Sequence, residues 1–124
     1  MEFISTDNAP KAIGPYSQAT RCGNILFVSG QIPIDPKSNM VIEGTIEEMT
    51  LQVLNNIKAI VEFSNFKITD IAKVTLFIKD MSHFGVINSI YESFFGDHKP
   101  ARAVVEVSRL PKDVLIEAEC IAIK

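Results

Sequence analysis

An arginine inside an otherwise small and apolar segment is the residue of this 124-residue chain whose surroundings most favour chemistry. Arg102 lies in ARAVV (101–105), a composition typical of a β-strand, where a guanidinium must find acceptors or water. Its planar fork matches a carboxylate in a bidentate way, so a pocket that contains it would select small organic acids. The alternative is an edge-strand arginine that extends into solvent or pairs with Glu106 or Glu119, and the segment alone does not separate the two.

Two carboxylates follow at a spacing that places both on one face of a strand. Glu117 and Glu119 lie two residues apart in LIEAEC (115–120), which is otherwise largely apolar. One could orient a water or move a proton while the other balances Arg102, because burial raises a carboxyl pKa toward the range that catalysis needs. The alternative is an ion pair across a contact between protomers, which suits Glu119 better than Glu117.

Four further residues have types and positions that suit the lining of a binding site. Tyr16 follows the Gly14-Pro15 turn, which places its phenol at a cavity mouth or against the rim of the core. Ser29 and Gly30 end a predicted strand, where they either meet a ligand or form a plain turn. Asn88 lies midway along a predicted helix, either exposed or hydrogen-bonded to a neighbouring loop.

The sequence gives no signal for covalent or metal-dependent chemistry. No serine has a nucleophile-elbow context, and neither Cys22 nor Cys120 has an evident histidine partner. His83 and His98 lack the cysteine or carboxylate arrangement of a zinc site and are expected to be solvated. We therefore expect no metal site.

Short strands and two amphipathic helices must position these residues. Thr45 and Glu48 form a capping box before apolar residues at helical spacing, which predicts a helix over 46–63. A second helix is predicted from about Ser82 to a glycine stop at Gly96. Runs of β-favouring residues predict strands at 25–29, 73–79, 101–107 and 114–123, with a weaker pattern near 16–21.

This order of elements indicates an α+β domain with one mixed sheet and both helices on a single face. The segments 25–28, 76–78 and 120–123 are nevertheless apolar at consecutive positions, so both faces of the sheet need cover. No further segment remains to cover the second face. We therefore expect another copy of the chain to cover it, in an obligate homo-oligomer.

Length and composition restrict the class of protein. A chain of 124 residues with 47% hydrophobic and 22% charged residues predicts a single globular domain over 1–124. Twelve basic against fifteen acidic residues give a net charge of −3, which argues against nucleic acid as a partner. Two distant cysteines suggest reduced cytosolic thiols, and we expect a cytoplasmic protein without a membrane partner because no secretion signal or membrane-spanning run is visible.

Several motifs taken together resemble those of one protein family. They are AIGPYSQA (12–19), FVSGQIP (27–33), INSIYESFF (87–95), KPAR (99–102), RLPKD (109–113) and IEAECIA (116–122). On these motifs, which occur in matching order over essentially the whole length, the chain resembles the Rid family, also called the YjgF family.

The resemblance implies a chorismate-mutase-like fold with a ferredoxin-like βαβ arrangement, assembled as a homotrimer with clefts between neighbouring subunits. Characterised members hydrolyse reactive enamines and imines, namely 2-aminoacrylate, 2-iminopropanoate and 2-iminobutanoate, to 2-oxo acids and ammonia. They use no cofactor and no metal, and their substrates come from pyridoxal-phosphate enzymes such as threonine dehydratase. The expected partners are therefore small 2-imino and 2-oxo acids and further copies of the chain.

The resemblance also suggests roles for individual residues. Arg102 matches the arginine that binds the substrate carboxylate, and Glu117 matches the acidic residue associated with the hydrolytic water. Tyr16, Ser29, Gly30 and Asn88 match residues that line the cleft. Val104 stands where many members have cysteine, so a function that needs this thiol is absent, whereas a backbone role would survive.

These observations lead to the hypothesis of an enamine/imine deaminase, a cofactor-independent hydrolase acting on C–N bonds. The competing hypothesis is a non-catalytic regulatory trimer that binds small acids in the same cleft, where Arg102 would serve equally well. A third activity, RNA cleavage, has been attributed to animal relatives, and the acidic charge balance argues against it here.

Overall fold

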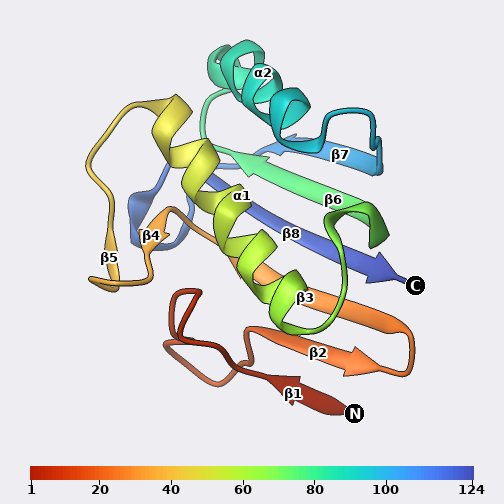
Figure 1. The fold of residues 1–124 in the computed structure, drawn as a ribbon. Helices are drawn as coiled ribbons and strands as arrows, with labels where there is room; N and C mark the ends of the chain where they lie inside the picture. Colours follow the sequence, from red (N-terminus) through yellow and green to blue (C-terminus); the bar gives the residue numbers. More distant parts are fainter.

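The computed structural model describes residues 1–124 and contains a six-stranded mixed sheet, a separate two-stranded hairpin and two α-helices (Figure 1). The sheet strands are β1 (Glu2–Ile4), β2 (Ala19–Cys22), β3 (Ile25–Gln31), β6 (Ile71–Ile78), β7 (Ala101–Glu106) and β8 (Ile116–Ile123). The hairpin strands are β4 (Ile34–Asp35) and β5 (Met40–Val41), and the helices are α1 (Ile46–Phe63) and α2 (Phe84–Phe95). Single 3-10 turns are η1 (Ile68–Asp70), η2 (Met81–His83) and η3 (Pro111–Asp113). The expected α+β architecture is confirmed.

The strand order in the sheet is β1-β2-β3-β8-β6-β7. β8 pairs antiparallel with both β3 and β6, so the last strand of the chain inserts between two strands that α1 connects. β6 and β7 pair in parallel across the α2 crossover, which leaves β7 at the edge of the sheet. The two strands that carry Arg102 and Glu117 are therefore separated by β6.

The first helix has the predicted bounds. The side chain of Thr45 accepts a hydrogen bond from the backbone N–H of Glu48 at 3.2 Å and closes the first turn, as the capping box predicts. Its buried stripe packs on the sheet and includes Val53, Leu54 and Ile57.

The second helix begins at Phe84, two residues later than expected. Residues 81–83 form the η2 turn instead, because Asp80 caps it by accepting the Ser82 N–H at 2.8 Å. The helix ends at Gly96, which adopts φ 60° as a glycine stop requires.

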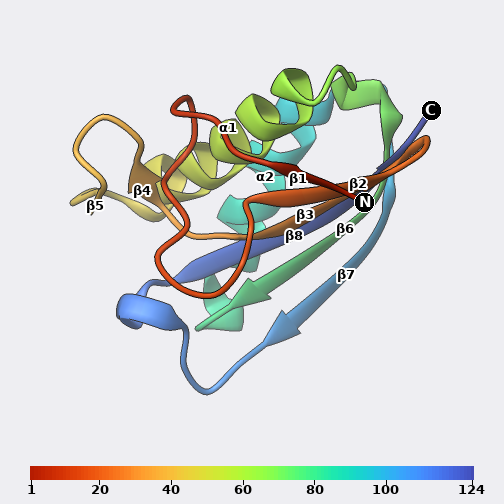
Figure 2. The same ribbon diagram turned by 90° about the horizontal axis from the view of Figure 1, so that it is seen from below.

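Both helices cover the same face of the sheet, as Figure 2 shows from the edge, and the other face carries no helix. We call this second face the open face. It presents apolar side chains from five strands, of which Phe27 is 44% exposed although it lies on an inner strand. The apolar side chains of the open face are Phe3, Ile25, Phe27, Phe77, Val105, Ile121 and Ile123.

The sequence analysis missed three short strands. β1 extends the sheet beyond β2, and β4 and β5 form the hairpin that leads into α1. Each has only two or three residues, too few to show an alternating pattern. No helix has the length and apolar character needed to cross a lipid bilayer.

Candidate active site

Arg102 lies on the helix-covered side of the edge strand β7. It pairs in register with Val74, whose side chain is buried beneath the helices. Its Nη1 donates a hydrogen bond of 2.6 Å to Oδ1 of Asn88 on α2, and its Cζ lies 4.8 Å from the ring centroid of Tyr91. The structure thus brings Arg102 and Asn88 together. Neither sequence alternative for Asn88, an exposed side chain or a hydrogen bond to a neighbouring loop, predicted this contact.

No carboxylate pairs with this guanidinium. The chain contains two ion pairs, Lys58–Glu62 and Arg109–Asp113. The alternative in which Arg102 pairs with Glu106 or Glu119 is therefore wrong within one chain, because Glu106 accepts from the N–H of Met81 and Glu119 leaves the opposite face of the sheet. Arg102 retains its full positive charge and remains exposed.

A cavity of about 390 Å³ surrounds Arg102, and we call it the arginine cavity. Asn88, Tyr91, Lys99 and Pro100 contribute to its walls. Arg102 and Lys99 thus contribute two cations to the lining and Glu92 one carboxylate, so the cationic residues outnumber the acidic one where a small organic anion would bind. Val104 follows two residues later on the same side of β7, half-buried against the core.

Glu117 lies on the open face of β8, beside Phe77 of β6. It lines a different cavity of about 530 Å³, the glutamate cavity, together with Tyr16, Ser29 and Gly30. Burial raises the pKa of the Glu117 carboxyl above its usual 4.5, and the neighbouring carboxylate of Glu119 raises it further. A carboxylate with a raised pKa accepts a proton more readily than an ordinary glutamate does.

A β-bulge places Ser29 and Gly30 against Glu117. β3 pairs with β8 at Val28 and again at Gln31, with a shift of register between them, so of the two sequence alternatives the plain turn is wrong. A Cβ at Gly30 would lie only 2.9 Å from Cδ of Glu117, so only glycine lets the carboxyl group approach this closely. The hydroxyl of Ser29 donates to the carbonyl of Ser17 at 2.6 Å and fixes the bulge to the preceding loop.

Tyr16 lies at the mouth of the glutamate cavity and is 48% exposed. Its hydroxyl accepts a hydrogen bond of 3.3 Å from the N–H of Ile13, and Gly14 before it has φ 148°. This placement agrees with the first of the two sequence alternatives, in which the Gly14-Pro15 turn directs the phenol to a cavity.

Gln18 holds the loop that carries Tyr16, and the sequence analysis overlooked it. This buried side chain accepts from Thr6 N–H at 2.6 Å and donates to three backbone carbonyls, of which Pro10 is the nearest at 2.8 Å. Its amide thereby satisfies backbone groups at both ends of the 6–10 segment, at Thr6 and at Ala9 and Pro10. The only sign of this role in the sequence is that an amide side chain lies inside the AIGPYSQA motif.

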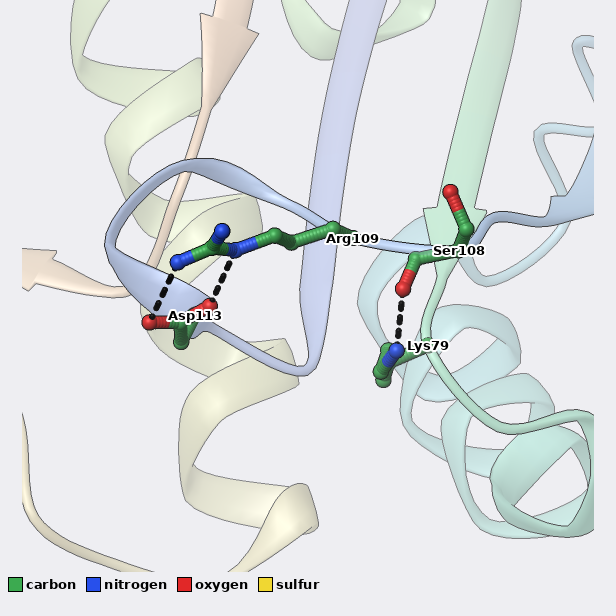
Figure 3. Close-up of polar contacts among 4 residues, drawn as sticks. All are labelled: Lys79, Ser108, Arg109 and Asp113. Carbon is green, nitrogen blue, oxygen red and sulfur yellow. Dashed lines mark hydrogen bonds and ion pairs between the residues drawn. The ribbon is translucent and has the colours of Figure 1, made fainter.

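The loop between β7 and β8 forms another wall of the glutamate cavity through Pro111 and Lys112. Figure 3 shows how it is held: Arg109 binds Asp113 with a 2.7 Å contact from Nε to Oδ1, and Nζ of Lys79 donates to the carbonyl of Ser108. Lys112 and Asp113 both have φ 56°, a conformation that non-glycine residues adopt only at a cost. This exposed ion pair thus spans a strained turn that lines the cavity of Glu117.

Of the two histidines and two cysteines, His98 borders the arginine cavity, and the other three residues border neither cavity. The expectation of solvated histidines is wrong, because His98 is half-buried with Nε2 2.7 Å from the carbonyl of Ile71, and His83 is half-buried as well. Burial raises the pKa of the Cys120 thiol to about 12, so it stays protonated. No three His, Cys, Asp or Glu side chains come together as a metal site.

The sequence-predicted residues therefore form two groups that do not meet within one chain. Arg102 and Asn88 border the arginine cavity, whereas Tyr16, Ser29, Gly30 and Glu117 border the glutamate cavity. Phe84 and Tyr91 are also close to Arg102, a contact that the sequence did not predict.

Comparison with known proteins shows full-length similarity to one family. Residues 6–124 match the family described as Endoribonuclease L-PSP. A RutC family protein of Pyrococcus horikoshii is 58% identical over 99% of this chain and 98% of its own length. The 2-iminobutanoate/2-iminopropanoate deaminase of Salmonella typhimurium is 50% identical over 98% of this chain and 96% of its own length.

The fold agrees with this similarity. The crystal structure of the YjgF gene product of Escherichia coli superposes with a TM-score of 0.96 at 48% identity, covering 100% of this chain and 99% of that one. The chain therefore belongs to the Endoribonuclease L-PSP family, which is the Rid or YjgF family that its motifs resemble.

Proposed function

We propose that this protein is a homotrimeric enamine/imine deaminase whose active site forms between protomers. Relatives that are about 50% identical are named 2-iminobutanoate/2-iminopropanoate deaminases, which supports the reaction class. The arginine and glutamate cavities each hold half of the residues that the reaction needs. The carrying observation is an exposed guanidinium without an ion-pair partner at Arg102, in the chain that also holds Glu117, whose carboxyl pKa is raised by burial.

The open face supports assembly. Its apolar side chains include Phe27, Val105 and Ile123, each more than two-fifths exposed in the isolated chain. An apolar face of this kind is stable in water when another protein surface covers it. Contact between open faces and neighbouring β7 edges brings Arg102 of one protomer toward Glu117 of the next, so one cleft contains both groups.

In this cleft Arg102 binds the carboxylate of a 2-imino acid through two parallel N–H···O hydrogen bonds. The imine carbon then faces a water held by Glu117. The water oxygen attacks this carbon while Glu117 accepts one water proton, and the carbinolamine nitrogen receives that proton. Glu117 then passes the proton of the carbinolamine hydroxyl to the same nitrogen, the C–N bond breaks with its electron pair on the departing ammonia, and the former hydroxyl oxygen becomes the carbonyl oxygen of the 2-oxo acid. An enamine substrate enters the same sequence after tautomerising to the imine.

The test replaces Arg102 by lysine, which keeps the charge and removes the fork. We expect the rate of 2-oxo acid and ammonia formation from enzymatically generated 2-iminopropanoate to fall about 10- to 100-fold, with the oligomer intact. Arg21→Lys is the matched control, because Arg21 also lies over an aromatic ring, that of Phe66, and borders neither cavity. Undiminished activity of Arg102→Lys would refute the assigned role, and wild-type protein that binds pyruvate without accelerating hydrolysis would indicate the regulatory alternative.

A further inference from the structure

One stripe of α2 carries three uncharged side chains that hold the Arg102 guanidinium. Phe84, Asn88 and Tyr91 follow one another at i, i+4 and i+7, so they lie on one face of the helix. The amide oxygen of Asn88 accepts from Nη1 at 2.6 Å, and Cζ of Arg102 lies 4.8 Å from the Tyr91 ring centroid and 5.5 Å from that of Phe84. We call these three residues the α2 cradle.

We propose that Tyr91 is a positioning residue, whose ring is the floor that fixes the Arg102 guanidinium for carboxylate binding without neutralising its charge. The inference rests on the proposed function of Arg102 and names a residue on which that function depends. Tyr91 borders the arginine cavity, and its ring acts through Arg102 rather than on the reacting atoms of the substrate.

The chemistry of the contact explains why an aromatic ring serves here. A carboxylate partner would fix the guanidinium equally well but would cancel the field that attracts an anionic ligand. An aromatic face attracts the cation through its quadrupole and leaves the N–H groups free for other acceptors. Within the cradle only Nη1 of Arg102 donates a hydrogen bond, so the other N–H groups of the guanidinium stay available to a ligand.

The ring is held rigidly and stays neutral. Tyr91 is only 8% exposed, and its ring packs on Phe95 with a centroid distance of 4.6 Å. Burial raises the pKa of the Tyr91 phenol above 10, although Arg102 opposes the shift. The cradle therefore presents the same uncharged surface to Arg102 throughout the neutral pH range.

The hydroxyl of Tyr91 takes no part in the proposal. Its oxygen is buried without a hydrogen-bond partner, which is unfavourable for folding. The ring and the hydroxyl can therefore be tested separately. Tyr91→Phe keeps the ring and removes the hydroxyl, whereas Tyr91→Leu removes the ring and keeps an apolar side chain in the core.

The experiment measures pyruvate affinity by calorimetry, and KM and kcat for 2-iminopropanoate hydrolysis. Tyr91→Leu is expected to weaken pyruvate binding and to raise KM about tenfold, with a smaller change in kcat. Tyr91→Phe is expected to stay within about threefold of wild type. Phe84→Leu, at the less buried rim of the cradle, is expected to weaken binding about threefold and provides a second variant if Tyr91→Leu does not fold.

Phe66→Leu is the matched control for loss of a cation–aromatic contact. Phe66 is buried beneath Arg21, whose Cζ lies 5.3 Å from the ring centroid, in a part of the chain that borders neither cavity. This variant is expected to lose thermal stability and to keep wild-type pyruvate affinity.

The outcomes separate the two proposals. Wild-type protein that binds pyruvate but does not accelerate imine hydrolysis contradicts the proposed function and leaves the role of Tyr91 standing if Tyr91→Leu weakens binding. Folded Tyr91→Leu and Phe84→Leu proteins with wild-type affinity and KM overturn the positioning role. Equal losses in Tyr91→Phe and Tyr91→Leu also overturn it, because they would assign the effect to the hydroxyl.

Discussion

Arg102 and Glu117 project from opposite faces of the same sheet. Arg102 lies beside the buried Val74 under the helices, whereas Glu117 lies beside Phe77 on the open face, with strand β6 between them. The sheet therefore lies between the two groups within one chain. In the proposed function, the arginine and the glutamate that act on one substrate come from two copies of the chain.

The first prediction concerns the open face. Replacing Phe27 by aspartate places a charge in the centre of this face, where a second copy is proposed to pack. We expect the proposed trimer of 13.7 kDa chains to dissociate to monomers and imine hydrolysis to fall at least about 100-fold, because desolvating an unpaired carboxylate is strongly unfavourable. Light scattering and circular dichroism measure mass and folding.

Phe63→Asp is the control for this variant. Phe63 is 52% exposed at the end of α1, away from the open face, so its replacement is expected to leave the mass unchanged. A Phe27→Asp protein that remains a trimer with full activity would show that the open face is not the contact surface.

The second prediction concerns the close approach of Gly30 to Glu117. The methyl group of Gly30→Ala would displace the Glu117 carboxyl, whose Cδ would otherwise lie 2.9 Å away. A carboxylate at the end of a flexible side chain can move, so we expect the protein to fold and kcat to fall about tenfold or more. The measurement is kcat for 2-iminopropanoate alongside a thermal melt.

Gly85→Ala provides the matched glycine control. A Cβ at Gly85 meets nothing within 4 Å, and the residue lies in the first turn of α2. This change is expected to stabilise the helix by about 0.5–1 kcal/mol without altering kcat. Equal kcat values for both alanine variants would remove the argument that Gly30 positions Glu117.

The third prediction concerns pH. Burial, followed by the effect of Glu119, raises the pKa of Glu117 above 4.5, so the folded state favours the protonated carboxyl. Its contribution to stability is complete below pH 4.5 and is lost as pH rises through the raised pKa. Glu117→Gln is therefore expected to melt a few degrees higher than wild type at pH 8 and to lose this advantage at pH 4.

The same variant is expected to lose activity about 100-fold or more, the usual contribution of a general acid–base group. Glu43→Gln, an exposed change of equal charge, serves as the control for net charge. A gain in melting temperature that persists unchanged at pH 4 would contradict the stated cause, and full activity would remove Glu117 from the mechanism.

The sequence was most informative where local rules determine structure. The capping box at Thr45 and Glu48 predicted the start of α1 correctly, because N-terminal capping depends on residues three apart in the chain. Gly96 predicted the end of α2 for the same reason. The uncovered face of the sheet was also predictable, since runs of consecutive apolar residues in strands imply burial on both sides.

The pairing register between strands that are far apart in the chain could not be predicted from the sequence. The bulge at Ser29 and Gly30 depends on how β3 pairs with β8, nearly 90 residues later in the chain, so the sequence predicts only the end of a strand there. The separation of Arg102 from Glu117 depends on the insertion of β8 between β3 and β6. Tyr91 fits the apolar stripe of α2, and only the register of β7 shows that Arg102 lies over its ring.

Subunit complementation tests the shared site most directly. Arg102→Ala and Glu117→Gln chains are co-expressed with different affinity tags, and assemblies that carry both tags are isolated. Each mixed trimer contains one interface with an intact arginine and an intact glutamate, so we predict about one-third of wild-type activity from two inactive parents. Mixed trimers of Arg102→Ala with the double variant, which contain no intact pair, should remain inactive. Mixed assemblies as inactive as their parents would contradict a site shared between protomers.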